Sequence, residues 1–335
     1  MCDGMTAVSY VLPYRSKQPP SDDFVQYVNR LSECVDLLVV DASSELIHCQ
    51  LEKRCGPRVR LMPPDPAWQH LRNGKVRGVL TGLRHALHDD VIIADDDVRY
   101  SEDNLAMMAV ALGTAEVVRP QNYFAPLPWH ALLDTARMLI NRVTGGDWPG
   151  TLAVKRAVVM RAGGYDGNVL FENLELVRTI EAAGGRAIVR RELLIERRPP
   201  TTTHFWSQRV RQAYDEFARP VRLVAALAIL PVSTVLVVTE HWGLLLAVLV
   251  IVPVALAEWG RRVAMGRQVF PAAASFCAPL WVVERGWCTW LAVLARLVVG
   301  GVPYHGHILA KAPNSPRTLN RRVVEASPPA SERYS

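Results

Sequence analysis

Three consecutive aspartates, Asp95, Asp96 and Asp97, directly follow the apolar run Val91–Ala94. A short apolar run predicts a buried strand, and side chains at the carboxyl end of a parallel strand face the ligand crevice of α/β proteins. Asp95 and Asp97 would share one strand face and could bind Mn²⁺ or Mg²⁺, which prefer oxygen ligands. The alternative is that the three acids form a solvated turn or cap the next helix.

Two further polar positions follow the same logic. Asp41 ends the apolar run Leu37–Val40, where a carboxylate can accept hydrogen bonds from a nucleobase or ribose, or can form a turn. Gly74 and Lys75 precede an apolar helical run, which would bring a cation near a phosphate. The sequence contains no G-x-x-x-x-G-K-[ST] loop, which argues against a P-loop nucleotidase.

These residues lie among short apolar runs that alternate with helix-like segments between residues 7 and 194. This alternation predicts an α/β fold with a mostly parallel sheet. Strands are expected at Val8–Leu12, Leu37–Val40, Val59–Leu61, Val91–Ala94, Val117–Arg119 and Ala187–Arg190. Helices are expected at Asp22–Cys34, Gly74–Leu87, Ser101–Ala111, Trp129–Val143 and Leu174–Ala183, with Ser101 as an N-cap.

The charge distribution changes after residue 220. Residues 1–220 hold 27 basic and 27 acidic side chains, whereas residues 221–335 hold 11 basic and 5 acidic ones, so the later part carries the whole excess of +6. A nucleic-acid-binding domain with an evenly basic surface is therefore excluded.

Two uncharged runs, Leu223–Val238 and Gly243–Ala257, predict a helical hairpin that crosses a membrane with the help of its flanking residues. Arginines precede and follow this hairpin, so the positive-inside rule places both of its ends and the α/β domain in the cytoplasm. The segment Val269–Val302 contains two prolines and Arg296, and it is either interfacial, re-entrant or two further spans. We therefore expect a multi-pass protein of the cell membrane.

In this order the motifs resemble those of the family 2 glycosyltransferases, which have the GT-A fold. The resemblance covers roughly residues 7–215. The first strand ends in Pro13, the second in the base-contacting Asp41, the Gly-Lys pair opens a helix, and the Asp-X-Asp metal motif follows. The resemblance implies a nucleotide-sugar-binding domain. Its donor-binding residues would be Pro13, Asp41, Lys75, Asp95 and Asp96, with Asp95 and Asp97 as metal ligands.

The catalytic loop of that family is matched by Phe171–Leu176, where the family usually has Glu-Asp-Leu-Glu-Leu. Asn173 stands at the position of the usual catalytic aspartate. Because an amide cannot accept a proton as a general base, either the adjacent Glu172 or another carboxylate takes this role, or the protein is inactive.

The family's Gln-x-x-Arg-Trp motif has a degenerate match in Gln208 and Arg211, without the tryptophan. Arg211 could neutralise the departing diphosphate or bind an acceptor phosphate, with a hydrogen bond from Gln208 beside it. Arg209 and Arg219 are interpreted as anchors to lipid headgroups. The stretch Arg296–Gly306 resembles the end of membrane-bound members in the ceramide-glucosyltransferase-like and related bacterial subfamilies.

The domains expected are a cytosolic GT-A domain at 1–220, transmembrane and interfacial helices at 221–310, and a basic disordered tail at 311–335. The implied function is inverting transfer of a sugar, dependent on Mn²⁺ or Mg²⁺, from a UDP-sugar to a lipid or polyprenyl-linked acceptor at the membrane. Two alternatives remain open: a catalytically silent nucleotide-binding membrane scaffold, and a nucleotidyltransferase on a similar fold.

Overall fold

The computed structural model describes residues 7–304 and 307–326. The chain forms two compact units. Unit 1 comprises Met1–Pro120, Trp148–Ile195 and Pro313–Ser335, and unit 2 comprises Gln121–Asp147 and Glu196–Ala312. Neither unit is a single stretch of sequence, so these units do not follow the predicted boundaries at residues 220 and 310, and those boundaries stay a prediction.

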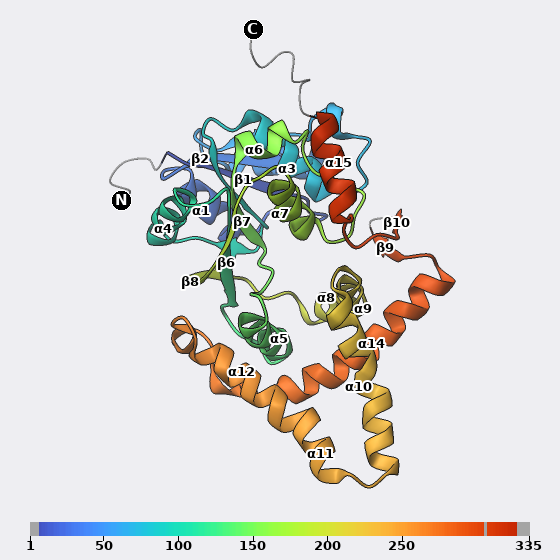
Figure 1. Cartoon of the computed structure of the whole chain (residues 1–335). Coiled ribbons are helices and arrows are strands. Elements are labelled where there is room, and N and C mark those ends of the chain that lie inside the picture. The colour runs from blue at the N-terminus through green and yellow to red at the C-terminus, as the bar shows by residue number, and fades with distance from the viewer. Residues whose placement is uncertain (1–6, 305–306, 327–335) are drawn as a thin grey trace. The chain divides into compact units, whose positions relative to one another are not determined.

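An eight-stranded sheet with the order β3-β2-β1-β4-β7-β6-β8-β5 forms the centre of unit 1 (Figure 1). Its strands are β1 (Ser9–Tyr14), β2 (Asp36–Asp41), β3 (Arg60–Met62), β4 (Asp90–Ala94), β5 (Val98–Arg99), β6 (Val117–Phe124), β7 (Thr151–Lys155) and β8 (Ala187–Arg197). Strands β6 and β8 continue past the unit boundaries at residues 120 and 195.

The sheet is mixed, which corrects the expectation of a mostly parallel one. Strands β3, β2, β1 and β4 pair in parallel, whereas β7 pairs antiparallel with both β4 and β6. Strand β7 was not predicted, because it is only five residues long and runs directly into a helix at Arg156.

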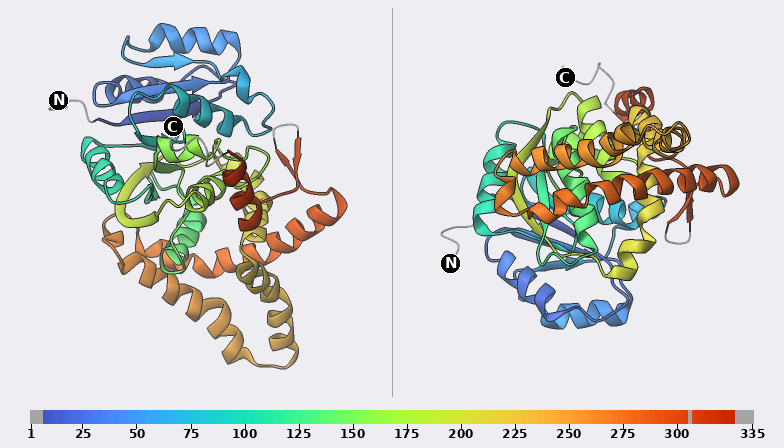
Figure 2. Two further views of the ribbon diagram at one scale, coloured as in Figure 1. Left: turned by 45° about the horizontal axis from the view of Figure 1, so that its top comes forward. Right: turned by 90° about the horizontal axis from the view of Figure 1, so that it is seen from below.

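Helices pack on the sheet of unit 1 in the pattern that the sequence predicts (Figure 2). They are α1 (Asp22–Leu31), α2 (Glu45–Arg54), α3 (Gly74–His85), α4 (Glu102–Leu112), α6 (Arg156–Arg161), α7 (Glu172–Ala182) and α15 (Pro316–Ala326), with a short 3₁₀ turn η1 (Pro66–Trp68). The predicted N-cap is confirmed, since the Ser101 side chain accepts the N–H of Asn104. Helices α2, α6 and α15 were not predicted.

Two glycines let α3 lie directly against β1. A Cβ atom at Gly82 would come within 2.3 Å of Val11 Cγ1, and one at Gly78 within 2.9 Å of Pro13 Cβ. A side chain at either position would therefore force the helix away from the strand. This close approach fixes the start of α3, and with it Lys75, at the carboxyl end of the parallel strands.

Helix α15 (Pro316–Ala326) lies inside the stretch 311–335 that was expected to be a disordered tail, which corrects that expectation for these residues. Ser315 caps α15 by accepting the N–H of Thr318, Pro316 opens the helix, and Leu319 is buried at 2% exposure. A capped, amphipathic segment of this kind gains burial energy that a polar tail lacks. The rest of the predicted tail, residues 327–335, lies outside the described residues.

Unit 2 is mostly helical. Its elements are α5 (Ala131–Val143), α8 (Thr202–Ser207), α9 (Arg209–Tyr214), η2 (Asp215–Ala218), α10 (Pro220–Val238), α11 (Trp242–Leu246), the π-helical η3 (Ala247–Ile251), α12 (Val252–Arg262), η4 (Gly266–Gln268), α13 (Ala272–Phe276), α14 (Ala278–Val298), β9 (Val302–Tyr304) and β10 (His307–Leu309). Residues 305–306, at the end of the stretch matched in the sequence, lie outside the described residues.

The predicted helical hairpin is present as Pro220–Arg262, here called the apolar hairpin. Among the described residues, two helices, Pro220–Val238 and Trp242–Arg262, are long and apolar enough to cross a membrane by length and composition. Only 11% and 17% of their most apolar windows are buried, unlike the core helix of a soluble protein. Two such helices alone are weak evidence for a membrane, and they do not support further spans. Helix α14 contains Glu284, Arg285 and Arg296 and is not one of the two.

Candidate active site

Lys75 lies between two carboxylates in unit 1. Its Nζ atom is 2.6 Å from Asp95 Oδ1 and 3.0 Å from Glu172 Oε1. Asn73 starts the helix that carries Lys75, because its side-chain oxygen accepts the backbone N–H groups of Lys75 and Val76. Three predicted residues that are far apart in the sequence thus form one ion-paired cluster.

The cluster is largely shielded from water. The side chains of Lys75, Asp95 and Glu172 are 18%, 22% and 13% exposed. Burial by itself lowers the pKa of the Lys75 ammonium, but the charges of Asp95 and Glu172 and their hydrogen bonds outweigh it and raise the pKa well above its ordinary value. Lys75 is therefore a permanent cation in this cluster.

Asp95, Asp96 and Asp97 form a tight turn between β4 and β5. The N–H of Val98 donates to Asp95 O at 3.1 Å, and the N–H of Asp95 donates to Gly150 O at 2.8 Å. The expectation that Asp95 and Asp97 share one strand face is wrong, because the strand ends at Ala94 and the aspartates belong to the turn.

We tested whether this turn suits a divalent metal. Among the described residues, no group of three or more His, Cys, Asp and Glu side chains is arranged to hold a metal ion. The turn does offer adjacent carboxylates, one of which already binds the cation of Lys75. Hard cations such as Mg²⁺ are commonly held by one or two carboxylates together with substrate phosphates and water. The residues fit a metal that binds together with a diphosphate.

Asp41 is the last residue of β2 and is buried at 3% exposure. Its Oδ1 accepts the N–H of Ser43 at 2.8 Å, and its Oδ2 lies 2.9 Å from His48 Nδ1. Tyr14, which follows Pro13, pairs with Asp41 across the sheet. His48 lies on helix α2, which was not predicted, and its contact with Asp41 was therefore not predicted either. The predicted contact of Asp41 with a nucleoside stays a prediction.

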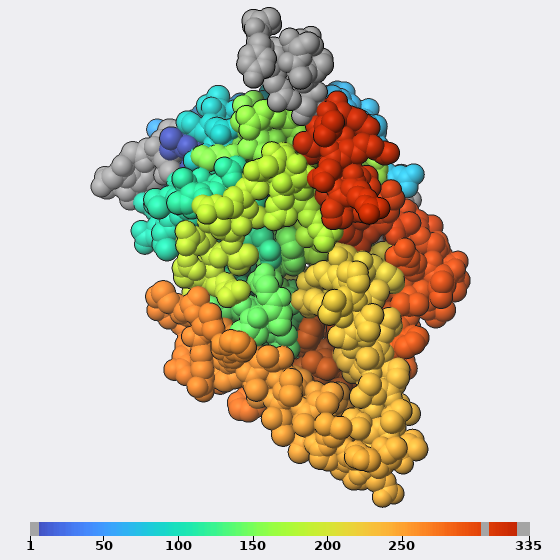
Figure 3. Space-filling view, viewed as in Figure 1, coloured from blue at the N-terminus to red at the C-terminus, as the bar shows by residue number. Residues whose placement is uncertain are grey.

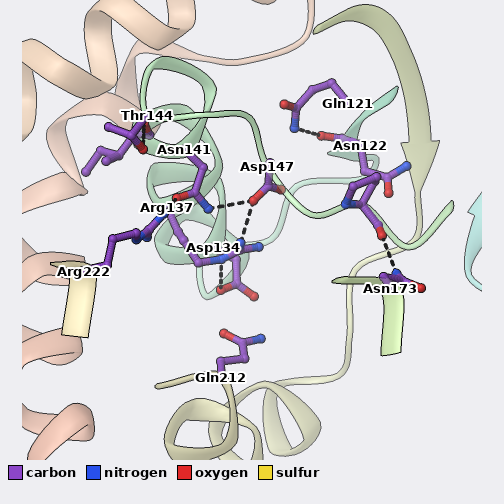
Figure 4. A network of polar contacts seen from close by, with 12 residues as sticks. Gln121, Asn122, Asp134, Arg137, Asn141, Thr144, Asp147, Asn173, Gln212 and Arg222 are labelled. Atoms are coloured by element: carbon purple, nitrogen blue, oxygen red, sulfur yellow. Dashed lines mark hydrogen bonds and ion pairs between the residues drawn. The ribbon is translucent and has the colours of Figure 1, made fainter. Parts of the chain in front are cut away.

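Asn173 acts as a hydrogen-bond donor (Figure 4). Its Nδ2 atom donates to Pro149 O at 2.9 Å and so ties the first turn of α7 to the segment before β7. An aspartate could not make this contact, because carboxylate and carbonyl oxygens are both acceptors. In this position Asn173 holds the loop and leaves Glu172 as the carboxylate at the start of the helix.

Aromatic residues support the same loop. The guanidinium of Arg119 lies 3.6 Å from the ring centre of Trp148, and that ring contacts Phe171 edge-on at 5.0 Å. Phe171 directly precedes Glu172. Cation–π and edge-to-face contacts of this kind each contribute about 0.5–2 kcal/mol. The contact between Arg119 and Trp148 was not predicted, because the two residues are far apart in the sequence and belong to no common motif.

Gln208 and Arg211 lie in unit 2. Gln208 joins α8 to α9, and Arg211 Nη1 donates to Gln208 Oε1 at 3.0 Å. The two matched residues of the degenerate motif therefore contact one another. Their predicted role towards a diphosphate or an acceptor phosphate stays a prediction.

Arg209 is not a headgroup anchor, contrary to the sequence-based interpretation. It is buried at 3% exposure and donates to Asp134 Oδ1 at 2.7 Å and to Gln212 Oε1 at 2.6 Å. Burial raises the pKa of the Asp134 carboxyl, but the charges of Arg137 and Arg209 outweigh it, so this pKa lies below its usual value.

The polar contacts around Asp134 extend along α5 within unit 2 (Figure 4). Asp147 Oδ1 accepts from Arg137 at 2.7 Å and from Asn141 at 2.8 Å, and Arg222 of α10 donates to Asn141 Oδ1 at 2.8 Å. The charge of Arg209 is paired with Asp134 inside unit 2, so the side chain is not available to a membrane surface.

Comparisons with known proteins give a structural likeness. No family model and no curated protein sequence matches this chain. The mannosyltransferase PcManGT from Pyrobaculum calidifontis, solved with GDP-Man and Mn²⁺, matches with a TM-score of 0.52 and 19% identity over 89% of this chain and 88% of that chain. The chain has the fold of a GT-A glycosyltransferase. The predicted fold is thus confirmed, and at 19% identity the likeness extends to the fold alone.

Two other solved structures are less similar. Glucosyl-3-phosphoglycerate synthase from Mycobacterium tuberculosis, in complex with Mn²⁺, UDP and phosphoglyceric acid, has a TM-score of 0.41 and 17% identity over 62% of this chain and 79% of that chain. TarS from S. aureus has a TM-score of 0.38 and 12% identity over 62% of this chain and 39% of that chain.

Proposed function

We propose that this protein is an inverting glycosyltransferase of family 2 that uses Mn²⁺ or Mg²⁺ and a nucleotide-sugar donor. The observation that carries the proposal is the cluster of Lys75, Asp95 and Glu172 at the carboxyl end of the parallel strands. It combines a cation for a diphosphate, a carboxylate for a metal and a carboxylate for proton transfer in one place.

The donor side of the proposed site consists of Asp95, Asp96 and Asp97 with Lys75, while Pro13 and Asp41 lie at the ends of the neighbouring strands β1 and β2. Asp95 and Asp97 would hold the metal, which when bound helps to neutralise the charge on the leaving diphosphate. Lys75 is positioned to contribute a second positive charge to the same diphosphate.

Glu172 is the proposed general base. Paired with Lys75, it is a carboxylate, the form that accepts a proton from an acceptor hydroxyl. Asn173 is excluded from this role by chemistry, because its amide has no basic site and its Nδ2 atom already donates to Pro149. Arg211 and Gln208 are proposed to bind the diphosphate or an acceptor phosphate.

The acceptor that we propose is a lipid or a polyprenyl-linked group. The apolar hairpin supports a place at the membrane, and the arginines at both of its ends favour a cytoplasmic catalytic domain. A protein that modified only soluble acceptors would gain nothing from two exposed apolar helices. The proposed location is the cytoplasmic face of the cell membrane.

The test is a donor screen with the full-length protein in detergent. Labelled UDP- and GDP-sugars are supplied with Mn²⁺ and a membrane lipid extract, and labelled lipid products are identified by mass. We expect one donor to give a glycolipid and a free nucleoside diphosphate, and we expect EDTA or Asp97→Ala to abolish both. Release of diphosphate from a nucleoside triphosphate would instead indicate a nucleotidyltransferase.

Replacement of the base gives a sharper prediction. Glu172→Gln should leave donor binding nearly unchanged and lower transfer by about 10²–10⁴-fold, because general-base catalysis contributes about that factor. The matched control is Glu102→Gln, since Glu102 is likewise the first residue of a helix but is exposed. Transfer rates and nucleotide affinity are measured for both variants.

The results separate the alternatives. Unchanged transfer in Glu172→Gln would assign the base to another carboxylate. Metal-dependent nucleotide binding without turnover, over the whole panel of donors and lipid acceptors, would instead support a silent membrane scaffold.

A further inference from the structure

A residue near the end of the chain binds the helix that carries Glu172. Asn314 is buried at 5% exposure and lies within unit 1, beside α7. Its backbone N–H donates to Glu175 Oε2 at 2.8 Å, and its Nδ2 atom donates to Glu175 Oε1 at 2.7 Å. One residue thus satisfies both oxygens of a single carboxylate.

Glu175 depends on these bonds because its surroundings are dry. It has 0% exposure, and Asn314 donates two hydrogen bonds to it. Burial raises the pKa of the Glu175 carboxyl, and the hydrogen bonds from Asn314 offset only part of this rise. A buried carboxylate without its donors is strongly destabilised, so Asn314 fixes the place of Glu175.

Asp166 completes the contact from the other side. Its Oδ2 accepts from Asn314 Nδ2 at 2.7 Å, and Arg322 of α15 lies 3.0 Å from the same oxygen. The outer side of α15 is open to solvent, as Figure 3 shows in red, while Leu319 is buried on unit 1. The segment 313–326 is therefore held on unit 1 by one buried amide, one ion pair and one apolar side chain.

We infer that Asn314 is a positioning residue for Glu172, acting through Glu175 on α7. The inference rests on the proposed function of Glu172 as the base. Glu172 and Glu175 lie one turn apart at the start of the same helix. Asn173 attaches the first turn of this helix to Pro149. Asn314 binds Glu175 and so attaches the following turn to the C-terminal segment. With both attachments, the carboxylate of Glu172 is held against Lys75.

The first test replaces the donor amide. Asn314→Asp has the same shape but brings a third carboxylate towards Glu175 and Asp166, and Asn314→Ala removes only the side-chain bonds. We expect kcat for transfer to fall by up to about 10²-fold in Asn314→Asp, the loss that a small misplacement of a catalytic group produces. The fall should be smaller in Asn314→Ala, and KM for the nucleotide-sugar should stay unchanged, because Lys75 and Asp95 are not displaced.

A rescue variant and a surface control distinguish positioning from general damage. The rescue variant combines Asn314→Asp with Glu175→Gln. The amide at position 175 then donates to the carboxylate at position 314, which reverses the native hydrogen bond, and kcat should recover in part. Arg321→Ala removes an exposed ion pair within the same helix, since the Arg321 and Glu325 side chains are 74% and 66% exposed, and should leave kcat unchanged.

Hydrogen exchange gives a readout that does not depend on activity. Amides of residues 172–176 should exchange faster in Asn314→Asp and Asn314→Ala than in the wild type or Arg321→Ala. Unchanged exchange in both variants would overturn the inference. So would an equal loss of kcat in Arg321→Ala, or a loss that appears only in KM. If the wild type transfers no sugar at all, the proposed function fails, and the exchange rates still decide whether Asn314 holds α7.

Discussion

At the scale of single residues, Lys75 and Asn173 divide the work of the proposed site. Lys75 is a charged group held by two carboxylates, and its surroundings are those of a group that binds anions. Asn173 is a neutral donor used to attach a loop. Where the proposed family usually has an aspartate, Asn173 thus makes a structural hydrogen bond.

This difference predicts the effect of placing at position 173 the aspartate that is usual in the proposed family. Asn173→Asp should not raise transfer, and it should lower the free energy of unfolding by about 1–3 kcal/mol, because the new carboxylate faces the Pro149 carbonyl without a donor. Thermal unfolding and transfer rates are compared with Asn320→Asp, a change at an exposed position on α15. A gain in transfer would show that position 173 serves catalysis directly.

Much of the site was predictable from the sequence. Asp41, Asp95 and Lys75 follow or precede apolar runs, and parallel topology brings such positions to one edge of the sheet. The turn geometry of Asp95–Asp97 was not predictable, because the apolar run does not show whether the strand ends at Ala94 or continues through the aspartates. The contact of Asn314 with Glu175 joins positions 139 residues apart with no periodic signal. Only the folded chain reveals it.

At the scale of elements, helices α10 and α14 are joined by a hydrogen bond that replaces the one lost at a proline in α10. Pro231 lies inside α10 and has no N–H, which leaves the carbonyl of Leu227, four residues earlier, without its helical donor. The indole N–H of Trp290 on α14 donates to this carbonyl at 3.1 Å. A side chain of one helix thus replaces a backbone bond of the other.

A double-mutant cycle tests this substitution of donors. Trp290→Phe should lower stability by about 1–3 kcal/mol, because an unsatisfied carbonyl remains in an apolar helix. In a Pro231→Ala background the loss should shrink by about 1 kcal/mol, since the alanine supplies the backbone donor. Thermal unfolding in detergent measures both, with Trp287→Phe on the same helix as control. Equal losses in both backgrounds would contradict the account.

At the scale of the whole molecule, the exposed faces of the apolar hairpin predict membrane attachment. Lysines replacing Val232, Leu244 and Ile251 together should release the protein from membranes into the soluble or aggregated fraction. Each lysine near the middle of a spanning helix costs roughly 2.5–3.5 kcal/mol. The three native side chains are 43%, 53% and 56% exposed, so the changes do not disturb a packed core.

The matched control places three lysines on exposed apolar positions of unit 1. Leu46, Leu87 and Val110 are 69%, 70% and 74% exposed. Alkaline extraction of membranes, followed by flotation on a density gradient, measures the attached fraction of each variant. The control should stay attached, and equal release of both triple variants would refute a membrane role for the apolar hairpin.

The division of unit 1 into separate stretches of chain also sets an order of events during synthesis. The segment 313–326 leaves the ribosome after the whole apolar hairpin, although its Asn314 binds Glu175, which was made 139 residues earlier. Until then α7 lacks the donor of its buried carboxylate. A nascent chain therefore completes the attachment of the helix of the proposed base only after its apolar segments have been synthesised.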